Sequence, residues 1–190
     1  MAAFSLIELM FVVGIVATLA SSAVAQIQTS LDAVRASGAA RHVMARLQQA
    51  RVRAVTRNRD IAVRIAADAR GYVMAVYEDG NGNGVIASDI QNGTDPQVGP
   101  TERLTDQYPG VDFGTLPGLP GVEGSPPPGT DPIRLGAGNG VTFTPDGTAT
   151  PGSLYVHGHG QWQFVVRIYG ETGRTRILAF NPRTRAWLSR

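Results

Sequence analysis

The first 25 residues of the chain contain one long apolar run with a single charge inside it. Residues 4–25 read FSLIELMFVVGIVATLASSAVA, and Glu8 is the only charged residue among them. A helix over this run is about 33 Å long, which is enough to cross the hydrocarbon core of a bilayer. Apolar side chains occupy every face, which is not typical of an amphipathic surface helix. The sequence therefore predicts a membrane-spanning helix.

Two kinds of processing compete for this run. Ala23-Val24-Ala25 is a small-x-small site, typical of a secretory signal that is removed to leave a soluble periplasmic protein beginning at Gln26. Against this, no Lys or Arg precedes the run, and a lone acid in a membrane segment costs about 2.5–3.5 kcal/mol. In the second interpretation the segment is retained. Glu8 is then tolerated because a neighbouring ammonium pairs with it.

The residues around Glu8 support the second interpretation. Ala3-Phe4-Ser5-Leu6-Ile7-Glu8-Leu9 resembles the prepilin motif of type IV pilins and type II secretion pseudopilins. The resemblance implies that prepilin peptidase cleaves between Ala3 and Phe4, so that residues 1–3 are a leader, and that Phe4 is N-methylated. It also implies that Glu8 meets the new amino terminus of a neighbouring subunit. Alanine replaces the family's usual glycine at position 3, and the short leader lacks the usual basic residues, so we expect the start codon to lie upstream.

The helical pattern continues beyond the apolar run. Apolar residues recur at three-, four- and six-residue steps and form one stripe: Ile27, Leu31, Val34, Gly38, Met44, Leu47, Ala50 and Ala54. No proline occurs before Pro96, so nothing stops the helix until about Asn58. We predict one helix over residues 4–58. Its part over 4–25 serves membrane insertion and assembly, and its amphipathic continuation over 26–58 packs the stripe onto a sheet.

Short β-type segments joined by tight turns follow the helix. The expected strands are 61–65, 72–77, 141–144, 154–157, 164–169, 174–180 and 186–188. Such runs predict antiparallel hairpins rather than βαβ units. The segment over 79–140 is rich in Gly, Pro and Asp, and we expect long, exposed and partly mobile loops there. The predicted fold class is α+β, with a long N-terminal α-helix packed on an antiparallel β-sheet domain over 59–190.

Three further segments narrow the resemblance. They are Gln48-Gln49-Ala50-Arg51, Phe143-Thr144-Pro145-Asp146-Gly147 and Gly173-Arg174-Thr175-Arg176. In this order the chain resembles the GspH/FimT group of minor pseudopilins and pilins over residues 3–78 and 141–180. The resemblance implies a pilin-like fold and a non-enzymatic subunit of a type II secretion pseudopilus or a type IV pilus tip. The implied partners are other pilin subunits, prepilin peptidase and the inner membrane, which the chain crosses once with its carboxyl-terminal domain in the periplasm.

All seventeen basic residues are arginine, and several lie near the carboxyl end. Strand alternation puts Arg174 and Arg176 on one face, and Arg183 and Arg185 follow closely enough in sequence to suggest one patch. In FimT-like members such a motif is associated with DNA uptake, so the resemblance implies DNA binding by phosphate neutralisation. The alternative is that these arginines are solvated or pair with acids of residues 79–131.

Asp79-Gly80-Asn81-Gly82-Asn83-Gly84 matches the first half of a calcium loop, D-x-N-x-N-G. The expected ligands are the side chains of Asp79, Asn81, Asn83 and Asp89 and the backbone carbonyl of Val85. Asp89 stands one place before the usual bidentate acid, and a plain Asn/Gly-rich turn is the alternative. We expect no other cofactor. The absence of cysteine excludes Cys-based metal sites and thiolate catalysis, and no Ser-His-Asp order or phosphate loop stands out.

Overall fold

A computed structural model describes residues 5–136 and 138–189, and the side chains of residues 22–25 are not described. Ala3 and Phe4, the predicted processing residues, lie outside the described residues. The elements in chain order are α1 (Leu6–Arg57), β1 (Ile61–Asp68), β2 (Gly71–Glu78), α2 (Ala87–Asn92), α3 (Leu104–Gln107), β3 (Asp112–Phe113), β4 (Ile133–Arg134), β5 (Gly140–Phe143), β6 (Gly152–His157), β7 (Gln163–Ile168), β8 (Thr175–Asn181) and β9 (Ala186–Ser189).

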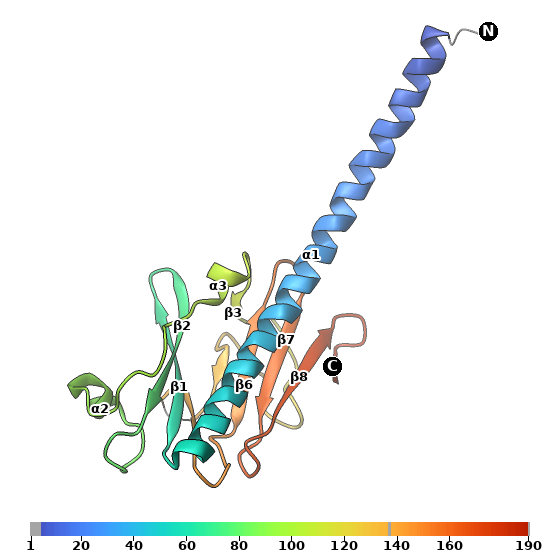
Figure 1. Cartoon of the computed structure of the whole chain (residues 1–190). Coiled ribbons are helices and arrows are strands. Elements are labelled where there is room, and N and C mark those ends of the chain that lie inside the picture. The colour runs from blue at the N-terminus through green and yellow to red at the C-terminus, as the bar shows by residue number, and fades with distance from the viewer. Residues whose placement is uncertain (1–4, 137, 190) are drawn as a thin grey trace.

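α1 is one uninterrupted helix, and its first half projects far beyond the rest of the molecule (Figure 1). Ser5 caps its start by accepting a hydrogen bond from the backbone N–H of Glu8. Asn58, in the left-handed conformation, ends it and donates its N–H to the carbonyl of Ala54. The predicted long helix is confirmed within the described residues.

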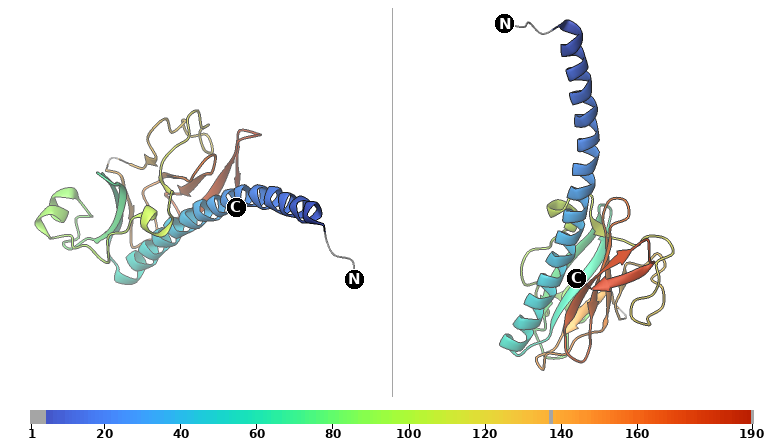
Figure 2. Two further views of the ribbon diagram at one scale, coloured as in Figure 1. Left: turned by 90° about the horizontal axis from the view of Figure 1, so that it is seen from above. Right: turned by 90° about the vertical axis from the view of Figure 1, so that its right-hand side faces the viewer.

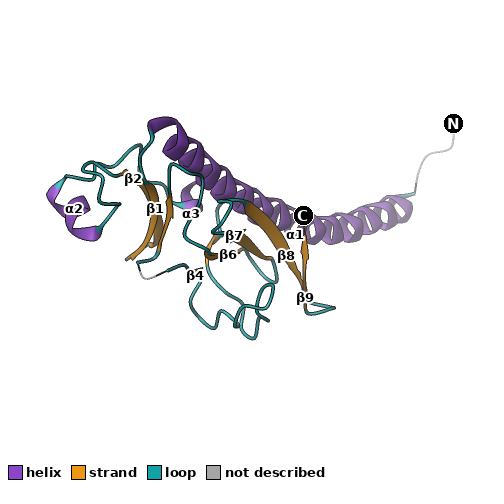
Figure 3. Cartoon of the chain, turned by 90° about the horizontal axis from the view of Figure 1, so that it is seen from below, coloured by secondary structure: helices purple, strands orange, loops and turns teal. Residues whose placement is uncertain are grey.

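The strands form two antiparallel sheets against the second half of α1. β2, β1 and β5 make a three-stranded sheet, and β3, β6, β7, β8 and β9, with β4 paired to β6, make a six-stranded sheet. The second half of α1 runs along one side of both sheets (Figure 3). Its first half projects away from them (Figure 2). The main core lies between the helix and the sheets. The predicted fold class is confirmed.

Small side chains on α1 bring the helix close to the sheets. The buried residues of this face are Ala36, Ala39, Ala40, Val43, Leu47, Ala50 and Ala54. At the β6–β7 turn, Gly158 faces the helix, and a Cβ added there would lie 2.7 Å from the Cβ of Ala36. The turn therefore needs glycine at this position, because any side chain would push the helix away.

The predicted apolar stripe is only partly right. Leu47, Ala50 and Ala54 are buried as expected, but Ile27, Leu31 and Val34 are 59%, 45% and 67% exposed. The reason is geometric: Val34 lies about 200° around the helix from the buried Ala36 and so faces away from the domain, while Ile27 and Leu31 precede the packed part of α1. The packed face begins at Ala36 instead.

Residues 79–140 are mostly loops and turns, as predicted, but they are not exposed throughout. This segment contributes α2, α3, β3 and β4, and it buries Val85, Leu104, Val111, Phe113, Leu119, Val122 and Ile133. Its apolar residues are isolated among Gly and Pro, so they show no period of 2 or 3.6. Each of them nevertheless fills a separate position in one of the two buried clusters or at the edge of a sheet.

Candidate functional site

The first half of α1 presents an exposed apolar surface. From Leu6 to Leu19 the large apolar side chains are 50–79% exposed. α1 is the one helix among the described residues that is long and apolar enough to cross a membrane, with a mean hydropathy of 2.1 over its best window. An apolar surface of this size needs lipid or another protein to cover it.

Glu8 lies in the first turn of this surface. Its side chain is exposed, and among residues 5–136 and 138–189 it takes part in no ion pair. A carboxylate on an apolar helix that enters a membrane or a helix bundle needs a cation from outside, because an isolated charge there is costly. The geometry thus leaves Glu8 available to a neighbouring chain, and its pairing there stays a prediction.

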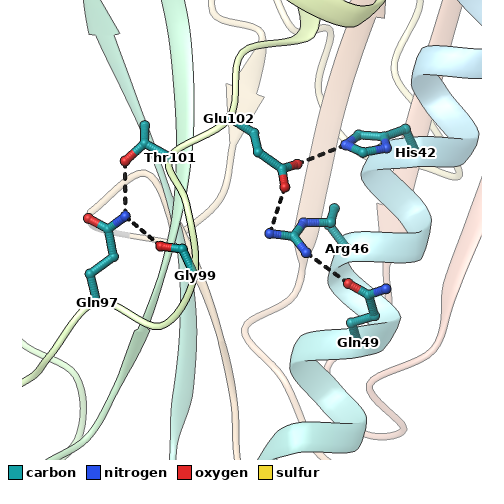
Figure 4. A network of polar contacts seen from close by, with 7 residues as sticks. All are labelled: His42, Arg46, Gln49, Gln97, Gly99, Thr101 and Glu102. Atoms are coloured by element: carbon teal, nitrogen blue, oxygen red, sulfur yellow. Dashed lines mark hydrogen bonds and ion pairs between the residues drawn. The ribbon is translucent and has the colours of Figure 1, made fainter.

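The side chain of Glu102, in the segment before α3, contacts two residues of α1 (Figure 4). One carboxylate oxygen lies 2.9 Å from Nε2 of His42, and the other lies 2.8 Å from a guanidinium nitrogen of Arg46. Arg46 also donates to the side-chain oxygen of Gln49 at 2.9 Å. The backbone of Glu102 pairs with Met74 at the edge of β2. No sequence pattern could identify this network, because its members lie about 60 residues apart.

Asp68 and Arg103 form a bidentate ion pair, in which two guanidinium nitrogens of Arg103 donate to the two carboxylate oxygens of Asp68. Arg103 is buried, whereas Asp68 lies at the exposed end of β1. The hydrogen bonds from Arg103 lower the pKa of Asp68 to about 2. The pair joins the end of β1 to the residue just before α3.

We expect acid to weaken the fold through this pair. Because the folded pKa of Asp68 is lowered, its contribution is fully present above the unfolded value of about 3.9 and is lost as pH falls through about 2. Thermal unfolding followed by circular dichroism should show a steeper fall of Tm below about pH 4 in the parent than in Asp68→Asn. Glu171→Gln, at an exposed turn, should keep the parent slope. Equal slopes in the parent and Asp68→Asn would contradict the assignment.

Hydrogen bonds from backbone N–H groups to the side chain of Asp79 stabilise the turn of the predicted calcium loop. Asp79 accepts hydrogen bonds from the backbone N–H of Gly82 at 2.7 Å and of Gly84 at 3.0 Å. The fold brings Asp89 to this turn, as the hypothesis requires. One oxygen of Asp89 accepts from the side-chain amides of Asn81 and Asn83 at 2.9 and 3.0 Å. The carboxylates therefore already have hydrogen-bond donors.

Two further contacts bear on the same loop. The backbone carbonyl of Val85, a predicted ligand, accepts a hydrogen bond from Arg64 at 2.9 Å. Asp95, which the sequence analysis missed, is buried and accepts from the backbone N–H of Gly80 and of Ile86 at 3.0 and 3.1 Å. Within the described residues no group of three or more His, Cys, Asp or Glu side chains is placed to hold a metal. The calcium site stays a prediction.

Arg174 and Arg176 share a groove at the end of the β7–β8 hairpin. The groove has a volume of about 790 Å³, and Arg51 of α1 and Arg167 of β7 also line it. Arg167 lies directly opposite Arg176 in the strand pairing. Arg176 contacts Glu123 at 3.7 Å, so one of the predicted pairings with acids of residues 79–131 is present. Arg167 also contacts Glu123, at 3.8 Å, and Glu171 lines the groove, so four guanidinium groups gather there beside two acids.

Arg183 and Arg185 do not join this groove. They lie in the turn between β8 and β9, and the seven residues of β8, about 23 Å of strand, separate them from Arg174. Arg185 donates to the carbonyl of Gly118 at 2.9 Å. The expectation of one patch from all four arginines is therefore wrong, because an extended strand holds the two pairs apart.

A family model and two solved structures are similar to the chain. The family model described as type II transport protein GspH matches residues 39–172. Two solved structures of the minor pseudopilin EpsH from the type 2 secretion system of Vibrio cholerae are similar to the chain. One is 19% identical, covers 76% of this chain and 97% of that chain, and has a TM-score of 0.47; the other is 17% identical, covers 75% and 92%, and has a TM-score of 0.44. No curated protein matches the chain.

Proposed function

The chain belongs to the GspH family of type II transport proteins, and on this premise we propose that it is a minor pseudopilin anchored in the inner membrane by the first half of α1. Members of the family are structural subunits of a secretion pseudopilus and not enzymes. In this proposal α1 crosses the membrane once over residues 4–25 and the domain over 59–190 lies in the periplasm. The observation that supports it is the bare apolar half of α1, with an unpaired Glu8 in its first turn.

The proposed assembly uses two chemical steps. Prepilin peptidase cleaves between Ala3 and Phe4, and the new amino group of Phe4 is methylated. The apolar half of α1 then moves from lipid into a bundle of equivalent helices, where Glu8 pairs with the ammonium of a neighbouring subunit. The transfer keeps apolar surface covered throughout, and the ion pair offsets the desolvation of the carboxylate. A subunit of a type IV pilus tip would assemble in the same way.

Mass spectrometry of the mature chain tests this proposal. We expect the mature protein to begin with N-methylated Phe4, because the membrane segment has to be retained for assembly. Ala3→Leu, which places a bulky residue before the cleaved bond, should leave residues 1–3 attached. A mature chain that begins at Gln26 would show that the segment is a discarded secretory signal and would contradict the proposal.

A second candidate function is DNA binding during DNA uptake, which the groove lined by Arg174 and Arg176 favours. Gel-shift titration of duplex DNA at rising salt checks it. The slope of log affinity against log salt is negative, and replacing Arg174 and Arg176 together by Ala should make it less steep by about two, one for each lost phosphate contact. The same double replacement at Arg183 and Arg185 is the matched control and should leave the slope unchanged. Binding unaffected by the first variant would exclude this groove as the site.

A further inference from the structure

A second groove lies where α1 leaves the domain, and none of the functions above uses it. We call it the stem groove. Its volume is about 660 Å³, and its walls come from three elements: Asp32 of α1, His159 and Trp162 of the β6–β7 turn, and Phe180 and Arg183 of the β8–β9 hairpin. Both turns lie at the end of the domain from which the bare half of the helix projects (Figure 1).

The position of the stem groove along α1 places it beside a membrane surface. The apolar run ends at residue 25, and the groove residues Thr29 and Asp32 follow about 6 and 10 Å further along the helix. The headgroup layer on each side of a bilayer core is about 5–8 Å thick. When the run spans the core, as the proposed function requires, Thr29 lies within the headgroup layer of the periplasmic leaflet and Asp32 just above it, so the groove opens at the outer side of that layer.

The charge in the stem groove suits an anion. Arg183 is exposed, and among the described residues its guanidinium has no ion-pair partner. Asp32, the acid among the described lining residues, already contacts Arg35 at 3.6 Å. The side chain of Asn181 accepts a hydrogen bond from the backbone N–H of Arg183 at 2.9 Å, which holds the turn. The groove therefore presents an unpaired guanidinium, a group that binds phosphate with two hydrogen bonds.

Two aromatic side chains of the groove, Trp162 and Phe180, also suit a position at the level of the lipid headgroups. Trp162 is partly buried and packs against the main core, and its indole N–H meets no acceptor within the part of the chain that the structure describes. Phe180 also lines the groove and is partly buried. Tryptophan is enriched at membrane interfaces because its ring is apolar while its N–H seeks a polar partner. A purely apolar helix of a neighbouring subunit would leave both Arg183 and this N–H without a partner.

We propose that the stem groove binds the headgroup of an anionic phospholipid in the periplasmic leaflet, with Arg183 contacting the phosphate and Trp162 lying at the interface. The inference rests on the proposed membrane anchoring. The bound headgroup would fix the height of the domain above the bilayer before the subunit is withdrawn into a filament.

Fluorescence quenching in lipid nanodiscs tests this inference on the full chain. The discs contain either phosphatidylglycerol or phosphatidylcholine, spin-labelled on the acyl chain close to the headgroup or near the bilayer centre. We expect the shallow label to quench Trp162 at least about twofold more strongly than the deep label, because the ring lies at the interface. Shallow-labelled phosphatidylglycerol should associate about fivefold more strongly than phosphatidylcholine, as expected for one basic side chain near the membrane surface.

Three variants show whether the signal and the lipid preference come from the stem groove or from other parts of the chain. Trp162→Phe leaves only the signal of Trp187, which measures the background. Arg183→Gln should abolish the preference for phosphatidylglycerol, whereas Arg174→Gln, an exposed arginine at the other end of β8, should keep it.

The outcomes distinguish this inference from the proposed function. A chain that does not enter the nanodiscs overturns the membrane anchoring and the groove proposal together. A chain that enters them overturns the groove proposal alone if the shallow label leaves Trp162 unquenched, if both lipids quench equally, or if Arg183→Gln keeps the preference.

Discussion

We expect Glu8→Ala to abolish incorporation of the subunit into filaments and to leave its membrane insertion intact. Removing one partner of a buried ion pair costs about 3–5 kcal/mol, which corresponds to a loss of more than about a hundredfold in incorporation. Insertion is unaffected or improved, because the change removes the one charge from the apolar run. Co-purification of the tagged chain with sheared filaments measures incorporation, and flotation with membranes measures insertion.

The matched control is a truncation of similar size on the same helix. Met10 is 68% exposed in the bare half of α1, and Met10→Ala removes apolar surface without touching the charge. It should lower incorporation far less than Glu8→Ala does. Normal incorporation of Glu8→Ala would show that the carboxylate is not neutralised by a neighbouring subunit. The retained acid would then need another explanation.

We expect Leu47→Ala to lower the free energy of unfolding of the domain by about 2–5 kcal/mol. Leu47 is fully buried between α1 and the sheets, so the change removes its contacts and leaves a cavity. Val52, one and a half turns further along the same helix, is 59% exposed, and Val52→Ala should change stability by no more than about 0.5 kcal/mol. Denaturant unfolding of the full chain in detergent, followed by near-UV circular dichroism, measures both. Similar losses in the two variants would mean that α1 does not form part of the core.

The helix and the regular strands were predictable because their signals are local. The absence of proline, the polar residue Ser5 before the apolar run and the late Asn58 define α1 within a few residues. β-branched and aromatic runs between Gly-containing turns define the hairpins β1–β2 and β7–β8. In each case neighbouring residues decide the outcome, so no knowledge of distant contacts is needed.

The candidate sites were only partly predictable, because their members meet through the fold. The pair of Arg174 and Arg176 follows from strand alternation, but Arg51 and Arg167 reach the same groove from α1 and β7. Asp95 lies outside the sequence pattern that begins at Asp79. Its carboxylate nevertheless accepts hydrogen bonds from the backbone N–H groups of Gly80 and Ile86, at the two ends of that turn. Side chains separated by tens of residues leave no periodic signal that pairs them.

Local signals in the sequence are enough to predict one long helix with a charged residue in its apolar half, followed by antiparallel strands. Local backbone preferences and hydrophobic patterning are sufficient for that. The tertiary structure selects the face of the helix that is covered: Val34 is exposed, whereas Ala36, about 200° further around the helix, is buried. It also decided that residues 79–140 fill the core and that Trp162 and Arg183 share one groove. These outcomes depend on which surfaces of distant segments fit together, and close packing selects them only once the whole chain has folded.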